Sequence, residues 1–399
     1  MRNEIIKAIK KEFGDAFYLL DSKQFRTNYE ELKHSFSSIY HRFNIAYSYK
    51  TNYTPKLCKI VNELGGYAEV VSEMELDLAL KVGVKPQNII WNGPVKNPTE
   101  LRKLLVLGGV VNIDSKDDLE LIKPIVDSNN GTIFSLGIRV NYDVGDDVVS
   151  RFGFDIESVE FNECLEYILS TKNVVFNNLQ CHFAKRSIEY WPARVSGMIQ
   201  LIDRIGVVPE RIDLGGGLFG KMEESLKQQF KSEIPSYEDY ANITAKAFRE
   251  RFGEKGPELI IEPGSALVVD CMKFVGTIKT IKNVRGKWFA SVLASQKNIS
   301  MSGVNPPIEV VHMGGKTVKY ENLDFVGFTC IEGDVLFKNY SGKLAKYDVI
   351  VISNCGSYSI VMKPPFILPN FPVVDISEGD VELIKRKETF DDIFHTFIF

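Results

Sequence analysis

The stretch "NIAYSYKTNYTPKLCKIVNELGGYAEVVS" (residues 44–72) decides the fold. It opens with an apolar run, Ile45–Tyr49, that is typical of a buried strand. A helix-like segment, "TPKLCKIVNEL", follows, and a second apolar run, Tyr67–Val71, comes next. Strand, helix and strand within about 30 residues form the unit from which parallel sheets are built.

This unit repeats along the chain from Asn44 to Gly264. The helix-like segment "PSYEDYANITAKAFRERFG" has Ser236 as a candidate N-cap and Gly253 as a stop. Eight βα repeats in about 220 residues predict a (β/α)8 TIM barrel. A doubly wound sheet is the alternative, but the first βα turn lacks the phosphate fingerprint that it would need. The eight predicted strands are Ile45–Tyr49, Tyr67–Val71, Asn88–Trp91, Gly109–Ile113, Ile133–Val140, Val174–Phe183, Arg211–Leu214 and Glu258–Glu262.

After Gly264 the pattern changes to short Val, Ile, Phe and Tyr runs that are separated by Gly, Pro and Asn. This texture predicts a C-terminal antiparallel β domain. The strand Ala16–Asp21 precedes the barrel, and we expect it to join the β domain. The predicted organisation is therefore an N-terminal helix and strand over 1–43, a barrel over 44–264 and a β domain over 265–399.

Composition narrows the class of protein. The 399 residues are 44% hydrophobic and 25% charged, and 48 basic against 52 acidic residues give a net charge of −4 with no basic block. This argues against nucleic acid as a partner. The N-terminus lacks the apolar core of a signal peptide, and no stretch approaches a membrane span. The six cysteines show no Cys-x-x-Cys spacing, so we expect reduced thiols, no metal site and a cytoplasmic protein without a membrane partner.

A barrel carries its chemistry at the C-terminal ends of its strands. There the sequence places Lys50 after the first predicted strand, His182 on the sixth, "DLGGGLFG" after the seventh and Glu262 at the end of the eighth. Each feature alone has an ordinary structural explanation. In the same order, these are a solvated strand end, a core histidine, a tight loop and a salt bridge. Their joint placement at one mouth favours a site.

Each of these groups has a chemical use. A desolvated lysine can have a lowered pKa and form a Schiff base. Gly215, Gly216 and Gly217 let backbone N–H groups approach an anion. Glu262 can hold a proton on a heterocyclic nitrogen, and the ring of His182 can stack on another ring. Together they describe a site for pyridoxal 5'-phosphate.

Nearly the whole chain resembles the fold-type III pyridoxal phosphate decarboxylases, the relatives of ornithine, arginine and diaminopimelate decarboxylase. The order of the family's motifs is kept throughout. "AYSYKTN" resembles the motif around the cofactor lysine, "AEVVSEMEL" resembles Asp-Val-Val-Ser-x-x-Glu-Leu, and "TCIEGDVL" resembles the Cys-Glu-Ser-Gly-Asp loop. Further matching segments are "IRVN", "SRFGF", "CHF", "DLGGGLFG", "IIEPGSALV" and "NCGSYSI".

The resemblance implies a pyridoxal phosphate-dependent carboxy-lyase that acts on an amino-acid-type substrate. Lys50 would hold the cofactor, His182 would stack on its ring and Glu262 would pair with its ring nitrogen. Gly215, Gly216, Gly217 and Tyr358 would bind the phosphate. The family's enzymes are homodimers with active sites at the interface, so Cys330 would come from the partner subunit and return a proton to the α-carbon. The alternative for Cys330 is a small buried hydrophobe.

Several positions depart from the family. Ser265 stands in place of an arginine that assists at the phosphate, residues 184–187 ("AKRS") replace Gly-Ser, and residues 295–310 lack an Arg-Pro that binds a distal carboxylate. The loop "CIEGD" moves its acidic residue by one place. These changes argue against a plain diaminopimelate decarboxylase and would suit a secondary-metabolite pathway.

Four residues are candidates for recognising the substrate. Glu332 and Asp334 could bind a distal ammonium. Lys185 or Arg186 could replace the missing cation at the phosphate or at a substrate carboxylate, or both could be solvated loop charges.

Two alternative functions stay open at this point. Amino-acid racemases share the barrel and the lysine, but those of this fold usually place arginine at the ring nitrogen, and Glu262 argues against that. A non-catalytic homologue that binds the cofactor is the second alternative. The presence of Lys50, Glu262 and Cys330 argues against it, while Ser265 leaves it open.

Overall fold

The computed structural model describes residues 2–300, 305–377 and 379–399, so residues 301–304 of the segment that lacks Arg-Pro lie outside the described residues. The chain forms two compact units. The barrel unit comprises Arg26–Phe219 and Ile234–Ala266. The sheet unit comprises the residues up to Phe25, Gly220–Glu233 and Leu267–Phe399.

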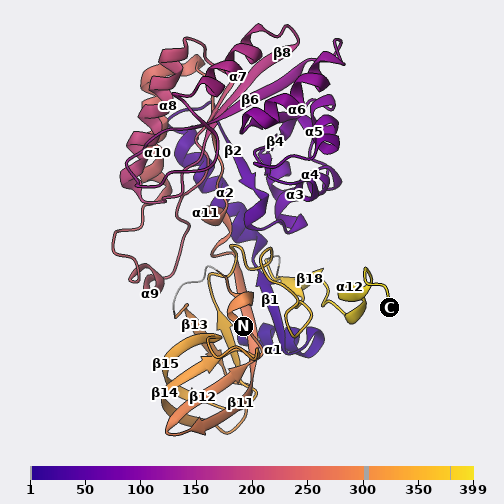
Figure 1. Ribbon diagram of the computed structural model, residues 1–399. Helices are drawn as coiled ribbons and strands as arrows, with labels where there is room; N and C mark the ends of the chain where they lie inside the picture. The colour runs from indigo at the N-terminus through magenta and orange to yellow at the C-terminus, as the bar shows by residue number, and fades with distance from the viewer. Residues whose placement is uncertain (1, 301–304, 378) are drawn as a thin grey trace. The chain divides into compact units, whose positions relative to one another are not determined.

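In the barrel unit, all of whose residues are described, eight parallel strands close into a ring (Figure 1). Pairing of β5 with β6 completes the circle, which confirms the predicted barrel. A short extra strand, β7 (Phe154–Asp155), pairs with the end of β6. The eight strands are β2 (Phe43–Ser48), β3 (Tyr67–Val70), β4 (Ile89–Trp91), β5 (Val110–Ile113), β6 (Phe134–Asn141), β8 (Val174–Cys181), β9 (Arg211–Asp213) and β10 (Glu258–Ile261).

Helices follow the strands and lie around them (Figure 1). Helix α10 (Tyr237–Phe252) begins with a capping box between Ser236 and Asp239 and ends at Gly253, which has φ +63°, as its sequence predicted. The other helices are α3 (Pro55–Glu63), α4 (Glu73–Lys81), α5 (Pro98–Val106), α6 (Lys116–Asp127), α7 (Val159–Ser170) and α8 (Trp191–Ile205). The short 3-10 turns of this unit are η1 (Tyr49–Thr51), η2 (Pro86–Asn88), η3 (Ile188–Tyr190) and η4 (Gly253–Lys255).

The barrel unit begins earlier in the chain than the predicted boundary at residue 44. Most of helix α2 (Ser22–Ser37) belongs to it. The Tyr40 hydroxyl donates to the Pro257 carbonyl at 2.6 Å, and Phe36 stacks on Phe43 with the ring centroids 4.6 Å apart. Helix α2 joins this unit because it buries its apolar face against the barrel. Conversely, residues 220–233, which include α9 (Glu224–Lys227), belong to the sheet unit.

The sheet unit contains a mixed sheet. Strand β1 (Ala16–Leu20) pairs antiparallel with β11 and parallel with β17. Strands β12 and β14 also pair in parallel. The antiparallel prediction is therefore wrong for the pairs β1–β17 and β12–β14 and holds for the other strand pairs described in this unit. The remaining strands are β11 (Met272–Val284), β12 (Lys287–Val292), β13 (Ile308–Val311), β14 (Val318–Val326), β15 (Val335–Leu344), β16 (Val349–Ile352), β17 (Val373–Asp375) and β18 (Glu382–Lys385).

Helix α1 (Arg2–Phe13) covers one face of this sheet, because Ile6 and Ile9 pack in one buried cluster with Phe17 and Leu19. The unit also contains η5 (Gln296–Asn298) and α12 (Phe390–Phe394), and α11 (Ser265–Val268) lies across the boundary between the two units. None of the helices in the described part of the chain combines the length and the apolar character that crossing a membrane requires.

Candidate active site

Lys50 lies just past the end of β2, in the 3-10 turn η1 rather than at the strand tip itself. Its side chain is 35% exposed and forms an ion pair with Glu69 of β3, whose side chain is 1% exposed. Burial lowers the pKa of Lys50, but the carboxylates of Glu69 and Glu262 outweigh burial, so the net shift is upward. The lowered pKa considered from the sequence is therefore wrong, and this amine is held as an ammonium until it gives up a proton.

Three carboxyl groups at the strand ends act electrostatically on this single amine, and Glu69 is the one in contact with it. Glu262 follows β10, Asp213 ends β9 and Glu69 lies on β3. Burial, reinforced by the charges of Asp213 and Glu69, raises the pKa of Glu262 well above its ordinary value. Burial also raises the pKa of Asp213 to about 6. The cluster therefore carries more acid than one lysine can neutralise, and its surroundings favour the protonated form of Glu262.

This excess of buried acid is the feature that fits a pyridoxal ring. A positively charged N–H group next to Glu262 would let the carboxyl ionise and would offset the cost of burying it. A protonated ring nitrogen is such a group. The carboxyl groups at the strand ends therefore match the chemistry of the cofactor that the sequence predicted.

Two amide side chains hold Glu262 in place. The Asn92 amide nitrogen donates to the Glu262 carboxyl, and the Gln180 amide nitrogen approaches the same carboxyl at 3.3 Å. Asn92 accepts in turn from Asn112 at 2.5 Å. Glu262 is thus fixed by strands β4 and β8, and sequence reasoning assigned no role to either amide.

His182 follows β8, and its ring is neutral. Burial, followed by the positive charges of Lys50 and Arg194, lowers the pKa of His182 well below its ordinary value. The backbone N–H of Gly216 donates to Nδ1 of His182 at 2.9 Å, so the ring hydrogen lies on Nε2. A neutral imidazole in a fixed orientation suits stacking on an aromatic ring.

The glycines after β9 are required by the space around them. A Cβ on Gly215 would lie 2.3 Å from the Cys181 carbonyl oxygen, and one on Gly216 would lie 2.6 Å from the Glu262 carbonyl oxygen. Gly215 and Gly217 also have φ +68° and +88°. The loop can therefore pass close to the ends of β8 and β10 only without side chains.

Two of the three glycine N–H groups already have partners. Gly215 donates to Asp213 at 2.8 Å and Gly216 donates to His182. Within the barrel unit, all of whose residues are described, the N–H of Gly217 makes no hydrogen bond. The phosphate-binding role of the three glycines stays a prediction, for which Gly217 is the best-placed donor.

Arg194 of α8 fixes the same loop from behind. This fully buried guanidinium donates to the Gly216 carbonyl at 2.6 Å and to the Leu214 carbonyl at 3.3 Å. It lies over the Trp191 ring, 4.3 Å from the ring centroid. Sequence reasoning missed Arg194, although an arginine on the helix that follows the His182 strand was a visible signal.

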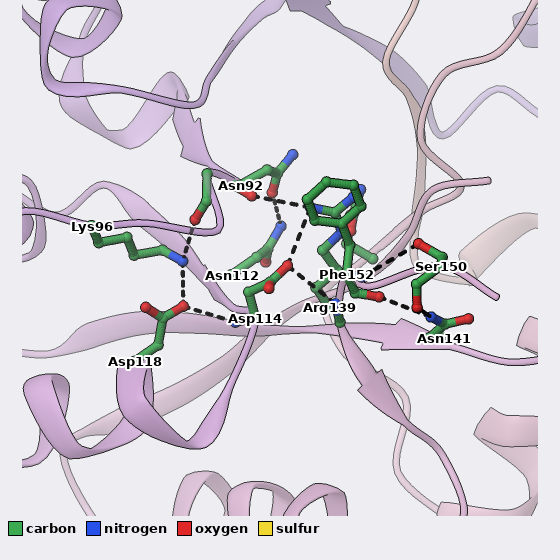
Figure 2. Close-up of polar contacts among 12 residues, drawn as sticks. Asn92, Lys96, Asn112, Asp114, Asp118, Arg139, Asn141, Ser150 and Phe152 are labelled. Carbon is green, nitrogen blue, oxygen red and sulfur yellow. Dashed lines mark hydrogen bonds and ion pairs between the residues drawn. The ribbon is translucent and has the colours of Figure 1, made fainter. Parts of the chain in front are cut away.

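A second polar network surrounds Arg139 at the ends of β4, β5 and β6 (Figure 2). Arg139 forms an ion pair with Asp114 at 3.2 Å, donates to the Asn92 carbonyl at 3.3 Å and lies over the Phe152 ring at 4.7 Å. Beside it, Lys96 and Asp118 form a buried pair at 2.5 Å. Asn92 thereby connects Glu262 to Arg139 of the "IRVN" segment, to which the sequence analysis gave no role.

The loop after His182 carries the two proposed cations. Lys185 is exposed and Arg186 is partly exposed, with its guanidinium 6.0 Å from the Phe219 ring centroid. Their backbone carbonyls are held by Arg194 at 3.3 Å and by Tyr240 at 2.8 Å. The loop is therefore anchored by its backbone, and its two cationic side chains remain candidates for binding an anion.

The remaining predicted residues belong to the sheet unit. Cys330 and Glu332 are exposed in the loop before β15, and Tyr358 is partly buried with φ +60°. Asp334 is buried and accepts from the Gln296 N–H at 2.8 Å and from the Thr329 hydroxyl at 2.6 Å. Asp334 therefore shapes the loop that presents Cys330.

Comparisons with known proteins identify the family of this chain. Residues 23–269 match the family model "Pyridoxal-dependent decarboxylase, pyridoxal binding domain". The chain is similar to diaminopimelate decarboxylase of Aquifex aeolicus, at 24% identity over 97% of this chain and 93% of that protein. It is also similar to the enzyme of that name from Methanothermobacter thermautotrophicus, at 26% identity over 96% and 91%.

Solved structures show the same fold. The crystal structure of diaminopimelate decarboxylase from M. jannaschii superposes with a TM-score of 0.86 at 22% identity, over 98% of this chain and 94% of that one. The lysine/ornithine decarboxylase of Vibrio vulnificus in complex with putrescine gives 0.74 at 18% identity, over 94% and 98%. Because the family model covers more than half of the chain and matches the barrel that holds Lys50 and Glu262, this protein belongs to the pyridoxal-dependent decarboxylase family.

Proposed function

We propose that this enzyme releases the α-carboxylate of an amino acid as carbon dioxide at the open end of the barrel, with pyridoxal phosphate bound to Lys50. The observation that carries the proposal is the ion pair of Lys50 with Glu69, within the electrostatic reach of the buried acids Asp213 and Glu262. This cluster joins one reactive amine to a carboxyl that needs a cationic partner.

Pyridoxal phosphate, when bound, supplies an aldehyde for a primary amine and a protonated ring that draws electrons from the bond to the leaving carboxylate. Glu262 keeps the ring nitrogen protonated, and Asn92 and Gln180 orient its carboxyl. The neutral ring of His182 supports one face of the site. The surrounding barrel strands hold these groups on rigid supports.

Lys50 must lose a proton before its amine can act as a nucleophile. Glu69 is the group in contact with its Nζ and is nearly fully buried, and its negative charge favours the ammonium form of Lys50. Glu69 therefore orients this amine and holds its proton while no ligand is bound.

The finer assignment concerns a second subunit. We propose a homodimer in which Cys330 of one chain returns a proton to the α-carbon bound in the other, while Tyr358 contacts the phosphate. The exposure of Cys330 on a loop braced by Asp334 supports a role in contacting a ligand rather than in packing.

For the substrate we propose an amino acid, free or conjugated, that carries a second charged group. Relatives named diaminopimelate decarboxylase, and an M. jannaschii structure in complex with L-lysine, support this class. Glu332 is the better candidate for a distal ammonium, because Asp334 is engaged within its own loop. Lys185 and Arg186 are candidates for an anionic end, and the departures from the family leave a secondary-metabolite substrate as an outcome of the test.

We also propose that the enzyme works in the cytosol. All six cysteines are free and five of them are buried. Free thiols in this number are typical of a reducing compartment.

The test is carbon dioxide release from purified enzyme with diaminopimelate, lysine, ornithine, arginine, diaminopropionate and citryl-type conjugates. We expect release from at least one substrate and none from Lys50→Ala, while Lys59→Ala, an exposed lysine of α3, keeps wild-type activity. A change of optical rotation without carbon dioxide would instead identify a racemase. Absence of carbon dioxide release with every substrate would contradict the proposal.

The shared site is tested by mixing two inactive variants, Lys50→Ala and Cys330→Ala. Each mixed dimer would contain one intact site of two. Because about half of the dimers are mixed after exchange of equal amounts, about 25% of wild-type activity should return. Light scattering gives the mass of each sample. A monomeric mass, or no recovery from a confirmed mixed dimer, would rule out a site shared between subunits.

A further inference from the structure

One segment of the sheet unit, residues 357–367, turns a charged side chain inward and apolar side chains outward. Lys363 is 8% exposed, whereas Met362 is 66% and Ile367 is 50% exposed. Ile367 also has φ +66°, a rare conformation for a β-branched residue. Lysine is almost never buried unless it is paired, so this inversion calls for a partner.

Lys363 lacks a counter-ion in the described part of the chain. Its Nζ has no hydrogen-bond partner there and lies 4.6 Å from the centroid of the Tyr18 ring. The nearby carboxylate of Glu388 is paired with Lys385 at 2.8 Å. Burial, followed by the charge of Lys385, lowers the pKa of Lys363 to about 7. Two amines and one carboxylate leave a surplus positive charge.

Two more buried polar groups lie near this amine. The side-chain oxygens of Asn298 and Ser357 have no partner among the described residues, and the two residues are 5% and 1% exposed. Tyr18 contacts two of these residues. Its hydroxyl donates to the Asn298 backbone carbonyl at 2.9 Å, and the ammonium of Lys363 lies over its ring.

A further hydrogen bond brings the two segments together. The Ser359 hydroxyl donates to the Ser300 carbonyl at 3.2 Å, so the segment of Ser357 runs beside that of Asn298. The ammonium of Lys363 and the hydroxyl of Ser357 are thus gathered in one region of one unit. Such donors complement the oxygens of an anion, and a charged donor strengthens the bonds.

We propose that Lys363 anchors a binding site for an oxyanion group, a carboxylate or a phosphate, on the sheet unit. The hydroxyl of Ser357 supplies a neutral hydrogen bond. The source of the group is a second carboxylate of the substrate or the phosphate of the cofactor. That source rests on the proposed function, whereas the existence of the site does not.

Binding is tested without activity by brief acetylation of the holoenzyme and mass spectrometry of its peptides. Glutarate and inorganic phosphate are the probes. A bound anion keeps the Lys363 amine protonated and covered, so we expect its acetylation to fall about tenfold. Lys319, whose side chain is 69% exposed, should be acetylated equally with and without the probe. Equal labelling of Lys363 in all samples would overturn the site.

Kinetics distinguish the two sources. With a substrate carboxylate, Lys363→Gln should raise KM for diaminopimelate about 10- to 100-fold and change KM for lysine less than about threefold. With the cofactor phosphate, the same variant should weaken binding of pyridoxal phosphate by a similar factor for every substrate. Lys363→Arg should recover part of either loss, and Lys319→Gln should change neither quantity.

The two proposals fail in different ways. Wild-type enzyme that releases no carbon dioxide from any substrate contradicts the proposed function, while the acetylation result still decides the site. An active enzyme in which Lys363→Gln changes neither KM nor cofactor affinity contradicts both sources of the anion, and equal acetylation of Lys363 in all samples contradicts the site itself.

Discussion

Asn92 and Glu262 are joined by a side-chain hydrogen bond across the barrel mouth, although 170 positions separate them in the sequence. The bond holds a buried carboxyl that has a raised pKa. Asn92 also receives a bond from Asn112 and, through its carbonyl, one from Arg139. A single amide therefore connects the acid of the site to the second polar network.

Replacing Asn92 by alanine should destabilise the protein by about 1–3 kcal/mol, because partners at both ends lose a buried hydrogen bond. Urea unfolding of the cofactor-free protein measures this free energy. Asn162→Ala, on the exposed side of α7, is the control and should change stability by less than about 0.5 kcal/mol. Equal stability of the two variants would contradict the bridging role of Asn92.

The raised pKa of Glu75 predicts that the stability of the fold depends on pH. Burial raises its pKa from 4.5 to about 7, although the Val71 N–H bond opposes this. The unfolded chain releases the proton first, so rising pH between about 4.5 and 7 destabilises the fold. Glu75→Gln should therefore gain on the order of 3 kcal/mol relative to wild type from pH 4.5 to pH 8. Parallel melting temperatures of the two proteins over this range would contradict the raised pKa.

Gly216→Ala should weaken cofactor binding by about tenfold or more. The new Cβ would lie 2.6 Å from the Glu262 carbonyl and 3.3 Å from the His182 ring, so the loop must shift and its hydrogen bond to His182 must change. Absorbance titration with pyridoxal phosphate measures the affinity. Gly131→Ala is the matched control, since a Cβ there meets no atom within 4 Å. Wild-type affinity in Gly216→Ala would show that the loop tolerates a side chain.

Lys363→Met should raise the melting temperature while it impairs anion binding. Its folded-state pKa of about 7 lies below the ordinary 10.5, so the unfolded chain binds more protons between these values. Wild-type stability should then increase with pH across this window, and the advantage of Lys363→Met should be largest near pH 7 and shrink towards pH 10. A constant difference between the two proteins would contradict an unpaired buried amine.

The barrel was predictable because its information is local. Each strand is a short apolar run, and each helix carries its own caps, as Ser236 and Gly253 do in α10. The boundary at residue 26 and the parallel partners of β1 and β12 were not predictable, because they depend on packing between distant segments. No local pattern encodes which strand will lie beside another.

The site divides along the same line. The sequence places Lys50, His182, the three glycines and Glu262 at strand ends, and the structure brings these barrel residues to one mouth. Asn92, Gln180 and Arg194 were missed, since amides and a helical arginine have many ordinary roles. The upward pKa shift of Lys50 was missed because it depends on how many carboxylates surround one amine.

The central claim is tested most directly by borohydride reduction of the enzyme loaded with pyridoxal phosphate, followed by peptide mass spectrometry. Reduction fixes the cofactor irreversibly on the amine that holds it. We expect the added mass on the peptide that contains Lys50, and no label there in Lys50→Ala. A cofactor fixed on another lysine, or no fixed cofactor in an enzyme that shows its absorbance, would contradict the account.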